Sequence, residues 1–280
     1  MAIIRDRFEG DEMAKVISFI MIVFIIVPAI APGVGQLILY FFSWKAIFMI
    51  FLIMAFIILI WFTLRINETL SLDARKSFSL KKIALDAKAV LSHPIALAYM
   101  ITAGFVSSPF IAFLNSAQQI LQEQYALKDY FPFVFAMIAL TVGSASFVNG
   151  RLVQRHGMQK MVKTAILCQL GWSTIFFIIF FFFMNQIPLL WMLTYFLPTF
   201  FFTGILFGNM NSLALQPLGH IAGMGAALVG AISTMISVFF GTFISQQYQG
   251  TIHPLVIGFL IFALLSTILI FRTEANRKDS

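Results

Sequence analysis

Long apolar runs separated by short polar segments set the pattern of this chain. A helix needs about 20 apolar residues to cross the hydrocarbon core of a bilayer. The runs do not alternate apolar and polar residues, as the strands of a membrane β-barrel would. We therefore predict an all-α integral membrane protein with about eight transmembrane helices, at residues 13–39, 46–64, 95–120, 131–150, 162–183, 188–213, 223–245 and 255–271.

One long polar stretch, 65–94, divides these predicted spans into two groups. Residues 1–64 hold two spans, and residues 95–280 hold six. The stretch between them is rich in Ser, Lys and Arg, as suits a cytoplasmic connector. Within it, residues 80–91 form either a plain solvated linker or an amphipathic helix at the membrane interface, with its charged residues toward water. These charged residues are Lys81, Lys82, Asp86 and Lys88.

Composition supports a membrane protein over a water-soluble one. Hydrophobic residues make up 60% of the chain, charged residues only 10%, and the mean hydropathy is +0.95. Positions 164 to 271 contain no Asp, Glu, Lys or Arg at all. A water-soluble domain cannot bury that much apolar surface, so the lipid bilayer is the expected partner.

The Lys and Arg residues give the orientation, because cytoplasmic loops of membrane proteins carry an excess of them. With a cytoplasmic amino terminus, the predicted inside segments hold 16 of the 18 basic residues, and the outside segments hold only Lys45 and Lys128. This bias predicts a multi-pass protein of the cell inner membrane with both termini in the cytoplasm. It also accounts for the net charge of +7, which therefore does not indicate nucleic-acid binding.

Residues for metal binding or covalent catalysis are sparse. The single cysteine, Cys168, lies in an apolar run and is expected to be a packing residue. The histidines His93, His156, His220 and His253 lack the paired spacing of metal ligands. All eleven acidic residues fall in predicted loops or at span ends. We predict no catalytic residue, no metal and no cofactor.

Two predicted spans carry polar stripes. Residues three and four apart share one face of a helix, and such a polar face either packs against another helix or lines a wet cavity. The stripe of the third span is Gly104, Ser108, Ala112, Asn115, Gln119 and Gln122, and that of the sixth is Trp191, Tyr195, Thr199, Phe202 and Asn209. We expect a substrate cavity to be lined by Ser108, Asn115, Gln119, Tyr195, Thr199 and Asn209.

The seventh span carries small residues instead, which suit close helix packing. They are Gly223, Gly225, Ala226, Ala227, Gly230 and Ala231.

The first predicted span contains Pro28, Pro32, Gly33 and Gly35, which predict a kinked, closely packed helix. Physics alone leaves functional and structural explanations equally open. The run resembles the fifth-helix antiporter motif of the major facilitator superfamily, Gly-x-x-x-Gly-Pro-x-x-Gly-Gly. Pro32 and Gly35 match the pattern, and Val27, Ala31 and Gln36 replace its glycines. The resemblance assigns Pro28, Ala31, Pro32 and Gly35 to the antiporter motif.

A second motif lies between the fourth and fifth spans, at residues 150–157. It is similar to the superfamily's loop pattern Gly-x-Leu-x-Asp-Arg-x-Gly, with Gln154 in place of the acid. The resemblance implies a tight cytoplasmic turn that locks and releases helix ends, and a simple positive-inside anchor explains the cations equally well. The matching residues are Gly150, Leu152, Arg155 and Gly157.

Residues 2–14 resemble the loop between helices four and five of the Bcr/CflA drug-efflux subfamily. This register makes the eight spans helices five to twelve of a twelve-helix fold. The third and sixth spans would then be helices seven and ten, which line the central cavity in this superfamily. The membrane-embedded acid of the subfamily lies in helix one, which this register leaves out.

The resemblance implies a multidrug efflux antiporter, which exports small hydrophobic or amphipathic drug-like compounds in exchange for protons by alternating access. Because a pore needs both six-helix halves, we expect that these 280 residues do not transport alone. A truncated product, a start assigned to an internal methionine and a fragment that needs an upstream partner each fit that expectation. A non-transporting membrane scaffold and a membrane-embedded enzyme are the alternative functions.

Overall fold

The computed structural model describes residues 23, 27, 30–65, 79–182 and 186–278, and these residues are helices and connections without a strand. Seven of the described helices are long and apolar enough to cross a membrane. They coincide with seven of the eight predicted spans, which confirms the all-α membrane fold. The remaining predicted span, 13–39, lies mostly outside the described residues, and its described end belongs to an apolar helix, Ile30–Phe41.

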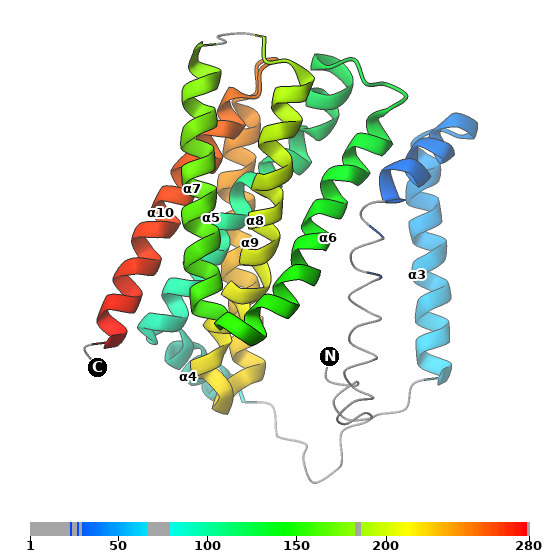
Figure 1. Ribbon diagram of the computed structural model, residues 1–280. Helices are drawn as coiled ribbons and strands as arrows, with labels where there is room; N and C mark the ends of the chain where they lie inside the picture. Colours follow the sequence, from blue (N-terminus) through cyan, green and yellow to red (C-terminus); the bar gives the residue numbers. More distant parts are fainter. Residues whose placement is uncertain (1–22, 24–26, 28–29, 66–78, 183–185, 279–280) are drawn as a thin grey trace. The chain divides into compact units, whose positions relative to one another are not determined.

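The chain divides into two units, Met1–Ser79 and Leu80–Ser280, which we call the first and second units. The first unit contains the helix Ile30–Phe41 and α3, Lys45–Arg65. The second unit contains six spanning helices and shorter segments (Figure 1). Its elements are α4 (Leu80–Leu91), α5 (Pro94–Gln118), the π-helix η2 (Gln119–Gln124), α6 (Phe131–His156), α7 (Met158–Phe182), α8 (Leu189–Leu215), η3 (Gln216–Ile221), α9 (Ala222–Gln246) and α10 (His253–Lys278).

Two helices, α5 and α8, form the centre of the second unit. α5 packs against α8, α9 and α10, and α8 also packs against α6 and α7. Within its most apolar window, α5 is 61% buried, whereas α6 is only 17% buried. The hydroxyl groups of α5 donate to carbonyl oxygens one turn earlier, as from Ser108 Oγ to Gly104 O at 2.8 Å. Such bonds let polar residues lie inside a helix bundle without unpaired donors.

Glycines allow α5 and α9 to approach closely. A Cβ atom on Gly104 would lie 2.7 Å from Ile236 of α9. A Cβ atom on Gly241 of α9 would lie 2.8 Å from Ile111 and from the backbone oxygen of Ser108. Of the small residues predicted from the sequence, Gly225 is buried and packs closely, since a Cβ atom there would lie 3.1 Å from Leu218. Gly223 and Gly230 are exposed and meet nothing within 4 Å, so the contact with α5 is made by Gly241 instead.

Several helices extend beyond the predicted boundaries. The sequence predicted a tight turn at residues 150–157, but α6 continues to His156 and only Gly157 leaves the helix. Within α6 the one proline, Pro132, lies in the first turn, and Gly157 has a positive φ, so the helix ends where glycine permits it. α10 likewise continues from the predicted end at Phe271 to Lys278.

Cys168 was expected to be a packing residue, and that prediction is wrong. Its side chain is exposed on α7, whereas Gln169, the next residue, is buried against α8. Composition showed that this run is apolar, but not which side of the helix faces its neighbours.

The segment Leu80–Leu91 is a helix, α4, as one of the two alternatives required, and its place at the membrane interface stays a prediction. It belongs to the second unit and packs against α9 and α5. Figure 1 shows α4 at the same end of this unit as the α6–α7 turn and the end of α10. We call this the basic end, because ten lysines and arginines lie there and only Lys128 lies at the opposite end. They are Lys81, Lys82, Lys88, Arg151, Arg155, Lys160, Lys163, Arg272, Arg277 and Lys278.

Candidate functional site

Exposed amides on α5 form the first part of the candidate site. Asn115, Gln118 and Gln119 are exposed, at spacings that place them on one side of the helix. This is notable because the rest of α5 is largely buried. A bare amide facing hydrocarbon is unfavourable, so this side of α5 is suited to face water or another polar surface.

The predicted polar stripe of α5 therefore separates into two parts. Gly104, Ser108 and Ala112 are buried, and the first two pack against α9. Asn115 and Gln119 remain accessible on the surface of the second unit. The helical spacing predicts one stripe for these five residues, but α9 packs against only one end of the stripe.

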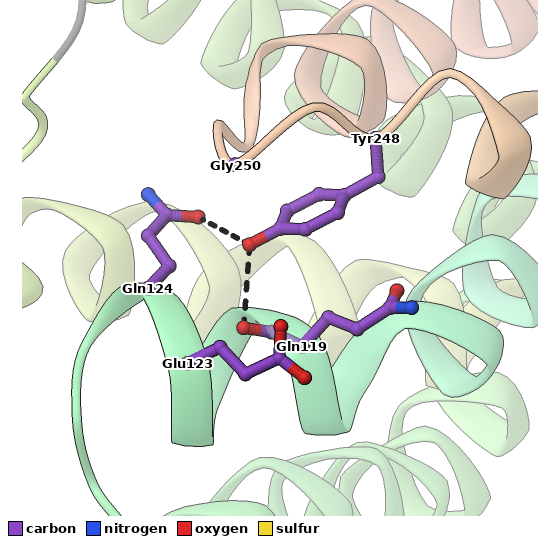
Figure 2. Close-up of a pocket in the computed structure, with 5 residues that line it drawn as sticks. All are labelled: Gln119, Glu123, Gln124, Tyr248 and Gly250. Carbon is purple, nitrogen blue, oxygen red and sulfur yellow. Dashed lines mark hydrogen bonds between the residues drawn. The ribbon is translucent and has the colours of Figure 1, made fainter.

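The exposed amide face ends in an open pocket of ≈ 390 Å³. The loop between α9 and α10, which lines it, lies at the end of the second unit opposite the basic end (Figure 1). The lining of the pocket combines η2 with this loop, and consists of Gln119, Glu123, Gln124, Tyr248 and Gly250 (Figure 2). The Tyr248 hydroxyl lies 3.2 Å from Gln119 O and 3.3 Å from Gln124 Oε1, and donates toward these acceptors. This contact joins residues that are 129 and 124 positions apart in the sequence.

A π-helix places these residues. α5 ends at Gln118, and the wider turns of η2 bring Gln119, Glu123 and Gln124 around the pocket rim. Burial, and secondarily the charge of Glu123, raise the pKa of Tyr248 above its ordinary value. A phenol is protonated at neutral pH even at its ordinary pKa, so Tyr248 is a hydrogen-bond donor there.

The pocket offers mostly oxygen acceptors. One carboxylate, two side-chain amides and a phenol suit a polar or cationic group that donates hydrogen bonds. In the described part of the chain, no group of three or more His, Cys, Asp or Glu residues could hold a metal ion. Glu123, Gln124 and Tyr248 were not predicted as site residues, because each lies outside the periodic stripe and only the fold brings them together.

Tyr195 and Thr199, also predicted to line a cavity, lie inside the second unit. Tyr195 is fully buried, its hydroxyl lies 3.3 Å from Ser173 Oγ, and its ring contacts an aromatic cluster. Thr199 donates to the Tyr195 backbone oxygen at 2.7 Å. Their role in a cavity stays a prediction. The contact between Tyr195 and Ser173 joins α8 to α7, whereas the bond of Thr199 lies within α8. The cluster around Tyr195 contains Phe176, Phe180, Phe196 and Phe259.

Asn209 is buried and pairs with the half-buried amide of Asn149. The Nδ2 atom of Asn209 donates to Asn149 Oδ1 at 2.7 Å and to Ile205 O at 2.9 Å. This pair joins α8 to α6 in the half of the second unit nearer the basic end. Asn149 was not predicted, although it directly precedes the motif that begins at Gly150.

An ion pair at the basic end was also missed. Lys163 of α7 pairs with Glu274 of α10, and the Tyr99 hydroxyl of α5 donates to Glu274 Oε1 at 3.3 Å. Glu274 is only 8% exposed. The sequence placed it beyond the last span, but the extended α10 carries it between two other helices.

The second motif lies at the basic end as well. Gly157 has φ +77° and ψ 153°, and its N–H donates to Val153 O at 2.8 Å. Leu152 is half-buried against the core, whereas Gly150 and Arg155 are exposed. The motif thus provides the C-terminal end of α6 and an exposed cation.

Of the first motif, Ala31, Pro32 and Gly35 lie in the helix Ile30–Phe41, and Pro28 lies outside the described residues. A Cβ atom on Gly35 would meet nothing within 4 Å. Gly35 therefore makes no close helix contact within the described part of the first unit, and the kink and the close packing at Gly33 stay predictions.

Comparison with known proteins gives consistent matches along the chain. The family model of the Major Facilitator Superfamily matches residues 1–242. An "Uncharacterized MFS-type transporter YdgK" from Bacillus subtilis is 26% identical over 99% of this chain and 68% of its own length. A "Bicyclomycin resistance protein homolog" from Haemophilus influenzae is 26% identical over 99% of the chain and 70% of its own length. "Multidrug transporter MdfA" from Escherichia coli is 25% identical over 61% of the chain and 40% of its own length.

Proposed function

The chain belongs to the major facilitator superfamily, and from this we propose that it exports small hydrophobic or amphipathic compounds from the cytoplasm by alternating access. The relatives named for bicyclomycin resistance and multidrug transport support this substrate class. By resemblance to the Bcr/CflA subfamily, protons are the proposed coupling ion.

The exposed amide face of α5 is the observation that carries this proposal. Asn115 and Gln119 lie on the spanning segment Pro94–Gln124, the most buried of the second unit, yet both residues are exposed. In a membrane, such polar residues normally face a water-filled cavity or another part of the protein. A transport path between two halves supplies that environment, with the Tyr248 pocket at its end.

The orientation follows from charge. The basic end of the second unit holds ten of its eleven Lys and Arg residues, so we propose that it faces the cytoplasm. The Tyr248 pocket then lies at the external side of the inner membrane, where an exported compound leaves. Both termini are cytoplasmic in this arrangement.

Export can be tested in cells that lack their own drug exporters. The chain is expressed by itself and together with helices one to four of the Haemophilus influenzae homolog. We expect resistance to bicyclomycin or another amphipathic drug only in the combined form, because alternating access requires two facing halves. Normal membrane insertion without export of any compound in a broad panel would refute the proposal.

The amide face is tested in the combined form. We expect Asn115→Leu or Gln119→Leu to reduce export at least about tenfold for some compounds, at unchanged membrane levels, because each removes a polar group from the path. Thr174→Val is the matched control, since Thr174 is exposed on α7 and its hydroxyl already donates to Leu170 O at 2.8 Å. Loss of folding instead of export would indicate that the amides serve packing in a scaffold.

A further inference from the structure

The helix α4 has sides of different chemical character. With about 100° between successive residues, Val90 marks the packed side, since it is fully buried and belongs to the core of the second unit. Lys81 and Lys88 lie on the opposite side and are exposed. α4 is thus fixed in rotation by its contacts with α9 and α5.

An exposed apolar strip separates these two sides. Leu80, Ala84 and Leu91 fall within roughly 40° of one another around the helix. Leu80 is 71% exposed and Leu91 is 44% exposed. The strip is bordered by Val90 and the bundle on one side, and by the two lysines on the other.

The connection to α5 holds α4 close to the membrane edge. Only Ser92 and His93 separate the end of α4 from Pro94, where a membrane-spanning segment begins. The turn is ordered, because His93 Nδ1 accepts from Ala96 N at 3.3 Å. Leu80 and Leu91 are therefore held beside the start of a membrane-spanning segment.

We propose that α4 lies in the cytoplasmic interface of the bilayer, with the Leu80 strip inserted and Lys81 and Lys88 bound to anionic lipid headgroups. This inference rests on the cytoplasmic orientation in the proposed function. A helix with an apolar face beside cations binds anionic interfaces, and the cytoplasmic leaflet is the negatively charged one. Because Lys81 and Lys88 are positively charged, anionic lipid is the partner that this surface of α4 fits.

The test measures which lipid contacts the strip. The full chain carries Cys168→Ser and Leu80→Cys, is labelled at position 80 with a fluorophore, and is reconstituted into phosphatidylcholine vesicles containing some phosphatidylglycerol. A quencher is attached to the acyl chain of one lipid or the other. We expect severalfold stronger quenching when the quencher is on phosphatidylglycerol. The ratio of quenching by phosphatidylglycerol to quenching by phosphatidylcholine should fall by roughly fivefold in Lys81→Gln, and likewise in Lys88→Gln.

Lys160→Gln is the matched control, because Lys160 is exposed at the same basic end but lies on α7. It should leave the preference unchanged. Equal quenching by both lipids, or the same preference in the lysine variants, would overturn the proposal. Absence of quenching by either lipid would overturn it too, because the strip would then face water or protein rather than lipid. The measurement does not depend on transport, so it can fail while the export proposal stands.

Discussion

At the scale of single residues, Gly157 occupies a backbone conformation that side chains rarely adopt. Its φ of +77° and ψ of 153° fall in a region used almost only by glycine. We expect Gly157→Ala to destabilise the protein by about 1–3 kcal/mol. The thermal unfolding midpoint in detergent would measure this as a decrease.

Gly150 provides the control within the same motif. It lies inside α6, and an added Cβ atom would meet nothing within 4 Å. Gly150→Ala should leave the midpoint unchanged or raise it slightly, because alanine favours a helix. Equal losses in both variants would contradict a conformational role for Gly157.

The Lys163–Glu274 pair makes a second prediction for single residues. Removing only the cation leaves Glu274 nearly buried without its partner, which is costly. Because Lys163 is 33% exposed, we expect Lys163→Met to cost about 1–3 kcal/mol rather than the full value for a buried pair.

The double variant Lys163→Met with Glu274→Met should recover part of that loss, since it leaves no unpaired charge. Lys160→Met, an exposed neighbour on α7, should have little effect on the unfolding midpoint. If the loss of unfolding free energy in the double variant equals the sum of the losses in Lys163→Met and Glu274→Met, the two charges act independently.

At the scale of helices, the contact between α5 and α9 depends on glycine. A Cβ atom on Gly241 would lie 2.8 Å from the backbone oxygen of Ser108, which cannot move without bending α5. We expect Gly241→Ala to destabilise the protein by about 1–3 kcal/mol through overpacking. Gly230→Ala on the same helix meets open space and should cause no loss. Similar midpoints for both variants would show that this contact is not tight.

At the scale of the whole molecule, the ends of α6 test the orientation. Lys128 precedes this helix and Arg155 lies in its last turn. In a Cys168→Ser background, we expect Lys128→Cys to react with an impermeant thiol reagent in intact cells. Arg155→Cys should react only after the inner membrane is permeabilised. A cysteine at Arg272 should behave like the one at Arg155, and labelling of positions 128 and 155 from the same side would refute the topology.

The positions and number of the spanning helices in the second unit follow from the sequence. A helix satisfies all its backbone hydrogen bonds internally, so in a bilayer an apolar run of sufficient length determines the element by itself. The distribution of Lys and Arg likewise predicts sidedness from local composition. Local composition also shows that Asn115 and Gln119 are unusual, because they are polar residues within an apolar run.

Which face of each helix is covered was decided only by the tertiary structure. Ser108 and Asn115 lie on one stripe, yet α9 covers the first at Gly241 and leaves the second exposed. The pocket at Tyr248 and the ion pair of Glu274 join residues more than 100 positions apart. Hydrophobicity distinguishes lipid from water, but it does not distinguish lipid from a neighbouring helix, so these contacts depend on shape and on hydrogen bonds between helices.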